Sequence, residues 1–161
     1  MIPTASPPTP DLDSRSQIHD MVVAFYREVV MDDLLGPVFE EVAEVDWSEH
    51  IPRLIDFWCR VLLGEPGYDG AILQVHQHVH DRSGFTADHF DRWYGLFTST
   101  IEDRWAGPYA DAAIAHAGRV ASSLGRRVAK VAWAPPGAPD AVVLEDDERP
   151  VPVLLGSRRG A

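Results

Sequence analysis

Three histidines stand two residues apart in the segment HQHVH, at positions 76, 78 and 80 of this 161-residue chain. Imidazole is the side chain that proteins use most often to bind a transition metal. Only residues three or four apart are neighbours on a helix, so His76 and His80 can share a face if the segment is helical, whereas His78 points elsewhere. The segment therefore offers one or two imidazoles to a metal rather than three.

The spacing of other metal-binding residue types narrows the kind of site. A carboxylate-bridged di-iron bundle needs Glu three residues before a histidine, and the histidines at 19, 50, 76, 89 and 116 follow Ser, Trp, Leu, Thr and Ala at that distance. The chain has no His-Glu-x-x-His zinc motif, and its single cysteine excludes a Cys-x-x-Cys pair and a Cys-x-x-Cys-His haem attachment. What remains is noncovalent haem held by one axial histidine among large apolar groups.

Four stretches with helical periodicity surround the histidine segment. Capping-box spacing at Ser14 and Gln17 precedes an apolar pattern with a helical repeat, and Gly64 ends a second such pattern. The sequence has no sustained period-two alternation and no Asn-Gly or Gly-Gly hairpin turn, so we expect an all-α fold. We expect helices over about 15–31, between Asp46 and Gly64, between Thr86 and Gly107, and over about 109–125.

Proline-rich segments lie at both ends of this helical core. Residues 1–13 contain four prolines among small polar residues and are expected to form a disordered tail. In residues 131–161 prolines interrupt every candidate helix, so this part is expected to be a disordered or loosely docked tail. One folded domain is therefore expected over residues 14–130.

The charge balance argues against nucleic acid as a partner. Twenty-five acidic residues against fourteen basic ones give a net charge of −11, which repels a phosphate backbone. The first residues have no basic start with an apolar core, and no stretch reaches the 18 apolar residues of a membrane span. A cytoplasmic protein with no membrane partner is the expectation.

Three segments together resemble the group III truncated haemoglobins. They read FYREVVMDDLLGPVFE at 25–40, DWSEHIPRLIDFWCRVLLGEPGYDG at 46–70 and HFDRWYGLF at 89–97, in the family's order and at similar separations. The likeness covers roughly residues 15–125. It implies a shortened globin in which two helix pairs, packed two over two, sandwich a noncovalent haem b.

The resemblance also implies a role for individual side chains. Tyr26, His50 and Trp93 would face a gas ligand on the distal side of the haem. Taken singly, each would be an ordinary core or surface residue, and only their joint order and spacing favour a site. His89 and His116 are expected to have no role in it. The residues expected to contact haem are Phe39, Leu54, Phe57, Trp58, His76, Val79, Phe85, Phe90 and Phe97.

The proximal iron ligand is expected to be His80. Alignment with the family from the left favours His76 and alignment from the right favours His80, because this chain has a few extra residues before the aromatic helix. His80 keeps the family's offsets to Phe85, Phe90 and Trp93, so we favour it. Its second ring nitrogen is expected to donate to a backbone carbonyl or water.

A distal side rich in hydrogen-bond donors favours slow release of O₂. The resemblance therefore implies binding of O₂, NO and CO, with NO dioxygenase or peroxidase-like activity or ligand capture rather than bulk oxygen delivery. A reductase is an expected partner for such chemistry. The alternative function is a haem-free globin-fold sensor or partner-binding module.

Overall fold

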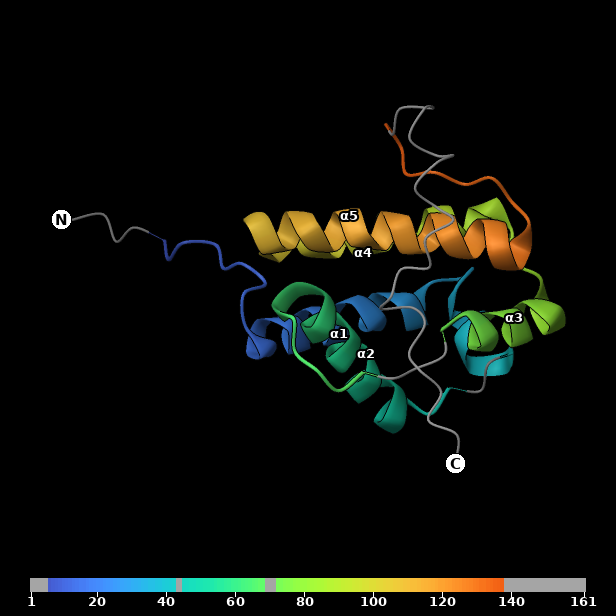
Figure 1. Cartoon of the computed structure of the whole chain (residues 1–161), viewed down its shortest axis with the longest axis horizontal. Coiled ribbons are helices and arrows are strands. Elements are labelled where there is room, and N and C mark those ends of the chain that lie inside the picture. The colour runs from blue at the N-terminus through green and yellow to red at the C-terminus, as the bar shows by residue number, and fades with distance from the viewer. Residues whose placement is uncertain (1–5, 43–44, 69–71, 138–161) are drawn as a thin grey trace.

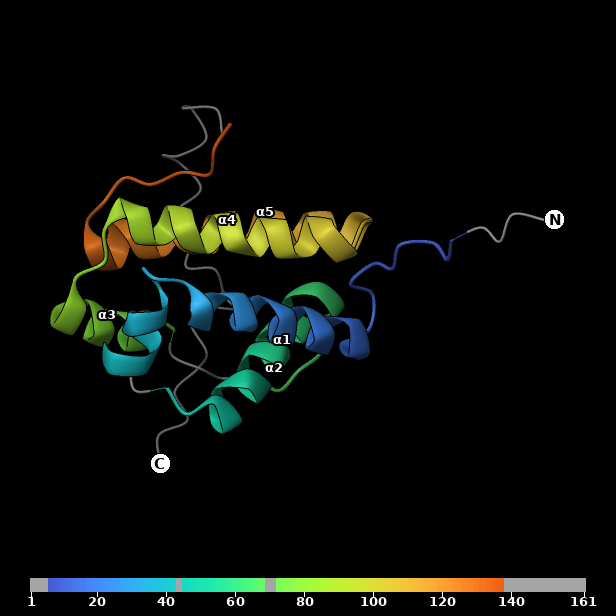
Figure 2. The same cartoon turned by 180° about the vertical axis from the view of Figure 1, so that it is seen from behind.

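The computed structural model describes residues 6–42, 45–68 and 72–137, and all regular structure in these ranges is helical. Figures 1 and 2 show two layers, with α4 and α5 side by side in one and α1, α2 and α3 in the other. The all-α prediction is confirmed. Within the described ranges, no helix is both long and apolar enough to cross a membrane. The elements are α1 (Arg15–Met31), η1 (Val38–Val42, a π-helix), α2 (Trp47–Leu63), α3 (Ile72–Ser83), α4 (Ala87–Arg104), α5 (Pro108–Leu124) and η2 (Gly125–Ala129, a π-helix).

Helix α1 forms where the capping pattern predicted it. The Ser14 side chain accepts a hydrogen bond from the Gln17 backbone N–H at 3.2 Å, which satisfies one of the free donors of the first turn. At the other end the Asp32 carboxylate accepts the backbone N–H groups of Leu34 and Leu35, both at 2.9 Å. This turn ends α1 and directs the chain into η1. The helix buries Ile18, Met21, Val22, Phe25, Tyr26 and Val29.

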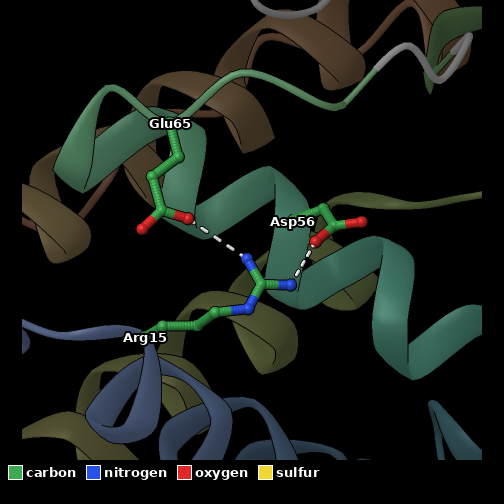
Figure 3. Close-up of polar contacts among 3 residues, drawn as sticks. All are labelled: Arg15, Asp56 and Glu65. Atoms are coloured by element: carbon green, nitrogen blue, oxygen red, sulfur yellow. Dashed lines mark hydrogen bonds and ion pairs between the residues drawn. The ribbon is translucent and has the colours of Figure 1, made fainter.

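Helix α2 is tied to the start of α1 by Arg15 (Figure 3). The guanidinium contacts Asp56 at 2.5 Å and Glu65 at 3.2 Å. All three side chains are more than a third exposed, so these ion pairs contribute little to stability. Instead, these ion pairs fix the position of the start of α1 relative to the C-terminal half of α2.

The chain before α1 also packs on the core. The Asp11 carboxylate accepts the backbone N–H groups of Tyr109 at 3.1 Å and Ala110 at 2.7 Å, and so caps α5. Gly107 has φ of 132°, and a Cβ there would lie 2.4 Å from the Asp11 carboxylate. Leu12 is fully buried. Contacts of the domain therefore begin before residue 14, within the segment that we expected to be a tail, and residues 1–5 lie outside the described part.

After η2 the chain runs back over the α4–α5 layer (Figure 1). Trp133 is buried there, and its indole N–H donates to the Asp91 carboxylate at 2.7 Å. Its ring packs on Phe90 and Tyr94. The contacts of the domain therefore extend past residue 130, into the second expected tail, of which residues 138–161 lie outside the described part.

Candidate functional site

Tyr26 lies on the inner face of α1 and is buried. Burial raises the pKa of its hydroxyl, and the Trp93 indole, as a hydrogen-bond donor toward the phenolic oxygen, opposes part of that rise. The Tyr26 hydroxyl proton itself has no acceptor in the described part of the chain. Buried donors are rarely left without an acceptor in folded proteins. The hydroxyl is thus available to a ligand.

His50 lies beside Tyr26, with 6.0 Å between ring centroids. Burial, together with the charges of His76 and Arg53, lowers the pKa of His50 to about 4, so its imidazole is neutral at pH 7. A neutral imidazole has one donor and one acceptor nitrogen. Neither nitrogen has a hydrogen-bond partner among the described residues. Tyr26 and His50, both predicted to face the ligand, therefore lie side by side, and each has polar atoms that are not used in hydrogen bonds with the described residues.

Two further rings complete what we call the distal aromatic cluster, defined as Tyr26, Phe39, Trp47 and His50. Phe39, from η1, lies 5.9 Å from Tyr26 and 6.5 Å from His50. Trp47, the first residue of α2, lies 5.6–5.8 Å from each of the other three rings. Sequence reasoning missed Trp47, although its position three residues before His50 on a helix was a usable signal.

Trp93 is the first ring of an aromatic stack that runs through the core. It lies parallel to Phe97, at 5.5 Å and 10°, and Phe97 lies parallel to Trp58, at 4.9 Å and 20°. The resemblance implied that Trp58 and Phe97 pack near Trp93, and the structure brings these three together. Leu54, also expected at the haem, is half-buried and packs against the core.

Phe57 lies among other rings than those of the distal aromatic cluster. Its centroid is 5.2 Å from Trp58, 5.3 Å from Tyr68 and 5.8 Å from His116. No ring contact links it to the distal aromatic cluster within the described residues. The expected contact of Phe57 with haem stays a prediction.

The histidine segment forms helix α3, a region for which sequence reasoning left the secondary structure open. His76 and His80 are one turn apart, and both approach Phe85, at 6.4 and 5.7 Å between centroids. Val79 between them is buried, and His78 is exposed. The helix therefore turns the two candidate ligands to one side, as their spacing suggested.

His80 is held by the loop that follows α3. Its Nδ1 accepts the Phe85 backbone N–H at 2.8 Å. In this structure that nitrogen accepts rather than donates, because an amide N–H can only be received by a bare ring nitrogen. The neutral ring consequently carries its proton on Nε2. Binding a metal through Nε2 requires that proton to leave and the Phe85 bond to rearrange. The expected donation to a carbonyl or water concerns the iron-bound ring and stays a prediction.

Phe85 connects the proximal residues to α4. Its ring lies 6.0 Å from Phe90, which is buried, and 6.0 Å from His89. His89 is committed to the start of α4, because its Nδ1 accepts the Thr86 backbone N–H at 3.0 Å. The expectation that His89 takes no part in the site stays a prediction.

The side chains present fit a haem in their chemistry. His80 offers a half-buried imidazole whose Nε2 would bind iron once its proton and the Phe85 bond rearrange, apolar Val79 and Phe85 lie next to it, and the distal aromatic cluster offers donors. No group of three potential metal-binding side chains occurs in the described ranges. Two surface cavities, of about 410 and 530 Å³, lie along α1, and none of the predicted site residues lines either of them.

Comparisons with known proteins give two matches and one negative result. The chain is 31% identical over 91 residues to a group 3 truncated hemoglobin of Campylobacter jejuni, covering 55% of this chain and 69% of the relative. The crystal structure of a group III truncated hemoglobin from Campylobacter jejuni matches with a TM-score of 0.66 and 26% identity, covering 75% of this chain and 95% of the other. No protein-family model matches the chain.

Proposed function

Because the chain belongs to the group III truncated haemoglobins, we propose that it binds haem b noncovalently and takes O₂, NO or CO as a ligand at the iron. Haem, when bound, supplies an iron centre that accepts a diatomic gas. His80 is the proposed axial ligand. We propose that Val79, Phe85 and Phe90 supply apolar contacts on its side, and that His76 meets a haem propionate or replaces His80 as the axial ligand.

The observation that carries this proposal is the buried Tyr26 hydroxyl, whose proton has no acceptor in the described part of the chain. An O–H group of this kind donates to a polar ligand that arrives beside it. Trp93 orients the phenolic oxygen, and neutral His50 stands ready as a second donor. These groups would hold a gas ligand with partial negative charge more firmly than an apolar wall does.

Firm retention suits chemistry at the ligand better than delivery of oxygen. We therefore infer NO dioxygenation, peroxide reduction or ligand capture as the physiological role, with a reductase as the partner that returns the iron to the ferrous state. The contribution of the chain is to position Tyr26 and His50 and to exclude bulk water with the rings around them.

An absorption spectrum of the purified protein, before and after dithionite and CO, tests haem binding. A Soret band that shifts with CO supports the proposal, and His80→Ala should abolish tight haem retention. An unchanged spectrum in His80→Ala, with loss in His76→Ala, would transfer the axial role to His76. A protein that stays colourless after incubation with haem would refute the proposal.

The proposed role of Tyr26 on the distal side is tested by measuring the rate of O₂ dissociation from the haem-loaded protein. Tyr26→Phe should speed dissociation by about tenfold, since a lost hydrogen bond of about 1.4 kcal/mol corresponds to that factor. Tyr94→Phe is the matched control, because Tyr94 packs on Trp133 away from the distal aromatic cluster. Equal rates in both variants would contradict the role of Tyr26.

A haem-free sensor or partner-binding module is the second candidate. One observation favours it: the two cavities along α1 are not lined by any predicted site residue, while the rings of the distal aromatic cluster pack against one another. If this second function is correct, the protein does not bind haem. The absorption spectrum described above then shows no Soret band and so distinguishes the two functions.

A further inference from the structure

Trp47 lies within 5.8 Å, between ring centroids, of every other member of the distal aromatic cluster, and Tyr26 reaches the other three rings at 5.6–6.0 Å. It stacks on Phe39 at 5.8 Å and 20°, meets His50 at 5.7 Å and 75°, and meets Tyr26 at 5.6 Å and 55°. These partners come from η1, α2 and α1. Because Tyr26 and His50 are proposed to face the ligand and Phe39 to contact haem, Trp47 links three separate parts of the proposed site.

The position of Trp47 is itself fixed by the start of α2. The Asp46 carboxylate accepts the Ser48 backbone N–H at 3.0 Å and the Ser48 hydroxyl at 2.6 Å. The Asp46 carbonyl accepts the His50 backbone N–H at 2.9 Å. Trp47 and His50 therefore sit one turn apart on a capped first turn, and their rings move together with it.

Hydrogen bonds do not orient His50 and Phe39, two of the three rings that Trp47 contacts. The His50 imidazole has no hydrogen-bond partner among the described residues, and Phe39 has no polar atom to anchor. Their orientation therefore depends on ring packing. Trp47 has the largest ring in the distal aromatic cluster, and aromatic pairs at these separations stabilise each other beyond simple burial.

We propose that Trp47 is a positioning residue that holds His50 and Phe39 against Tyr26 and thereby closes the distal side of the site. This inference rests on the proposed haem function. Removing the indole should let His50 swing outward and let gas and water reach the site faster. A smaller aromatic ring at position 47 should preserve most of the contact with Phe39.

The kinetic test is CO rebinding after flash photolysis of the haem-loaded protein. Trp47→Ala is expected to raise the association rate by about fivefold or more, whereas Trp47→Phe stays within about twofold of the natural chain. Trp133→Phe is the matched control, because it alters an indole outside the distal aromatic cluster, and it should leave the rate unchanged. Equal rates for Trp47→Ala and the natural chain would overturn the proposal.

A second test needs no haem. The ring protons of His50 in the haem-free protein experience the ring currents of Trp47, so Trp47→Ala should move them toward the NMR positions of an exposed histidine, and Trp47→Phe should move them less. If the natural chain binds no haem, the proposed function fails while this test still decides the role of Trp47. Should Trp47→Ala lose its helical circular dichroism, Trp47→Leu replaces it, and unmoved His50 signals in that variant would refute the inference.

Discussion

Lowering the pH from 7 to 5 is expected to destabilise the haem-free protein through His116, a histidine of α5 outside the proposed site. The side chain is only 6% exposed and packs against Phe57 and Trp58, each at 5.8 Å between centroids. Its Nε2 is buried and has no hydrogen-bond partner in the described part of the chain. Burial, with the charge of Arg119, lowers the pKa of His116 to about 4.

The sign and size of the effect follow from this pKa. The unfolded chain takes up the proton at about pH 6.5, whereas the folded chain resists it down to about pH 4. The contribution of His116 to stability is therefore intact above pH 6.5 and is lost as the pH falls toward 4. At about 1.4 kcal/mol per pH unit, the whole interval corresponds to about 3 kcal/mol.

Urea denaturation of the natural chain and of His116→Leu, at several pH values between 5 and 7.5, measures this contribution. Between pH 6 and 5 the free energy of unfolding should fall more steeply in the natural chain, by about 1.4 kcal/mol per pH unit. At pH 7.5 the variant should be equally stable or more stable, because leucine removes a buried nitrogen without a partner. His50 is present in both proteins, so its titration cancels.

Replacing His78, which is exposed, with glutamine provides the control and should leave the slope of the natural chain unchanged. Parallel stability curves for the natural chain and His116→Leu would refute the reasoning. They would mean that water or a structural rearrangement solvates the His116 imidazolium in the folded state.

Three further substitutions test the packing that surrounds the site. Asp11→Ala should lower the free energy of unfolding by about 1 kcal/mol through loss of the α5 cap, and an unchanged urea midpoint would argue against that cap. Trp133→Phe should also cost about 1 kcal/mol, because the hydrogen bond to Asp91 is lost, and in an Asp91→Ala background, which has no acceptor at that position, a much smaller effect is expected in the same assay. Phe97→Ala should cost roughly 3–5 kcal/mol, since Phe97 is fully buried, and a thermal midpoint near that of the natural chain would contradict its place in the core.

Local signals in the sequence were enough to predict four of the helices. Ser14 and Asp46 accept backbone N–H groups at the starts of α1 and α2, and Gly64 ends α2 in the left-handed conformation, all as expected. These interactions span only a few residues, so spacing alone reveals them. Helix α3 was left open because its described segment alternates histidine with other residue types and has no clear apolar repeat.

Contacts between residues far apart in the chain could not be predicted from residue spacing. Asp11 caps a helix that begins almost a hundred residues later, and Trp133 reaches back to Asp91. Both lie in proline-rich segments whose composition suggested tails. The Phe85 bond to His80 was missed for a different reason: it depends on the path of the loop, which no residue spacing encodes.

Both helices of the α4–α5 layer are tied to segments outside it. Asp11 ties the beginning of α5 to the segment before α1, and Trp133 ties the segment after η2 to the first half of α4. Helix α3 is joined to α4 through Gly84, which has φ of 72° and free space around it. Swinging α3 outward at that glycine would break the Phe85 N–H bond to His80 and the packing of α3 on η1 and η2. The loop at Gly84 therefore joins the candidate proximal histidines to the α4–α5 layer, so a shift of either part is transmitted to the other.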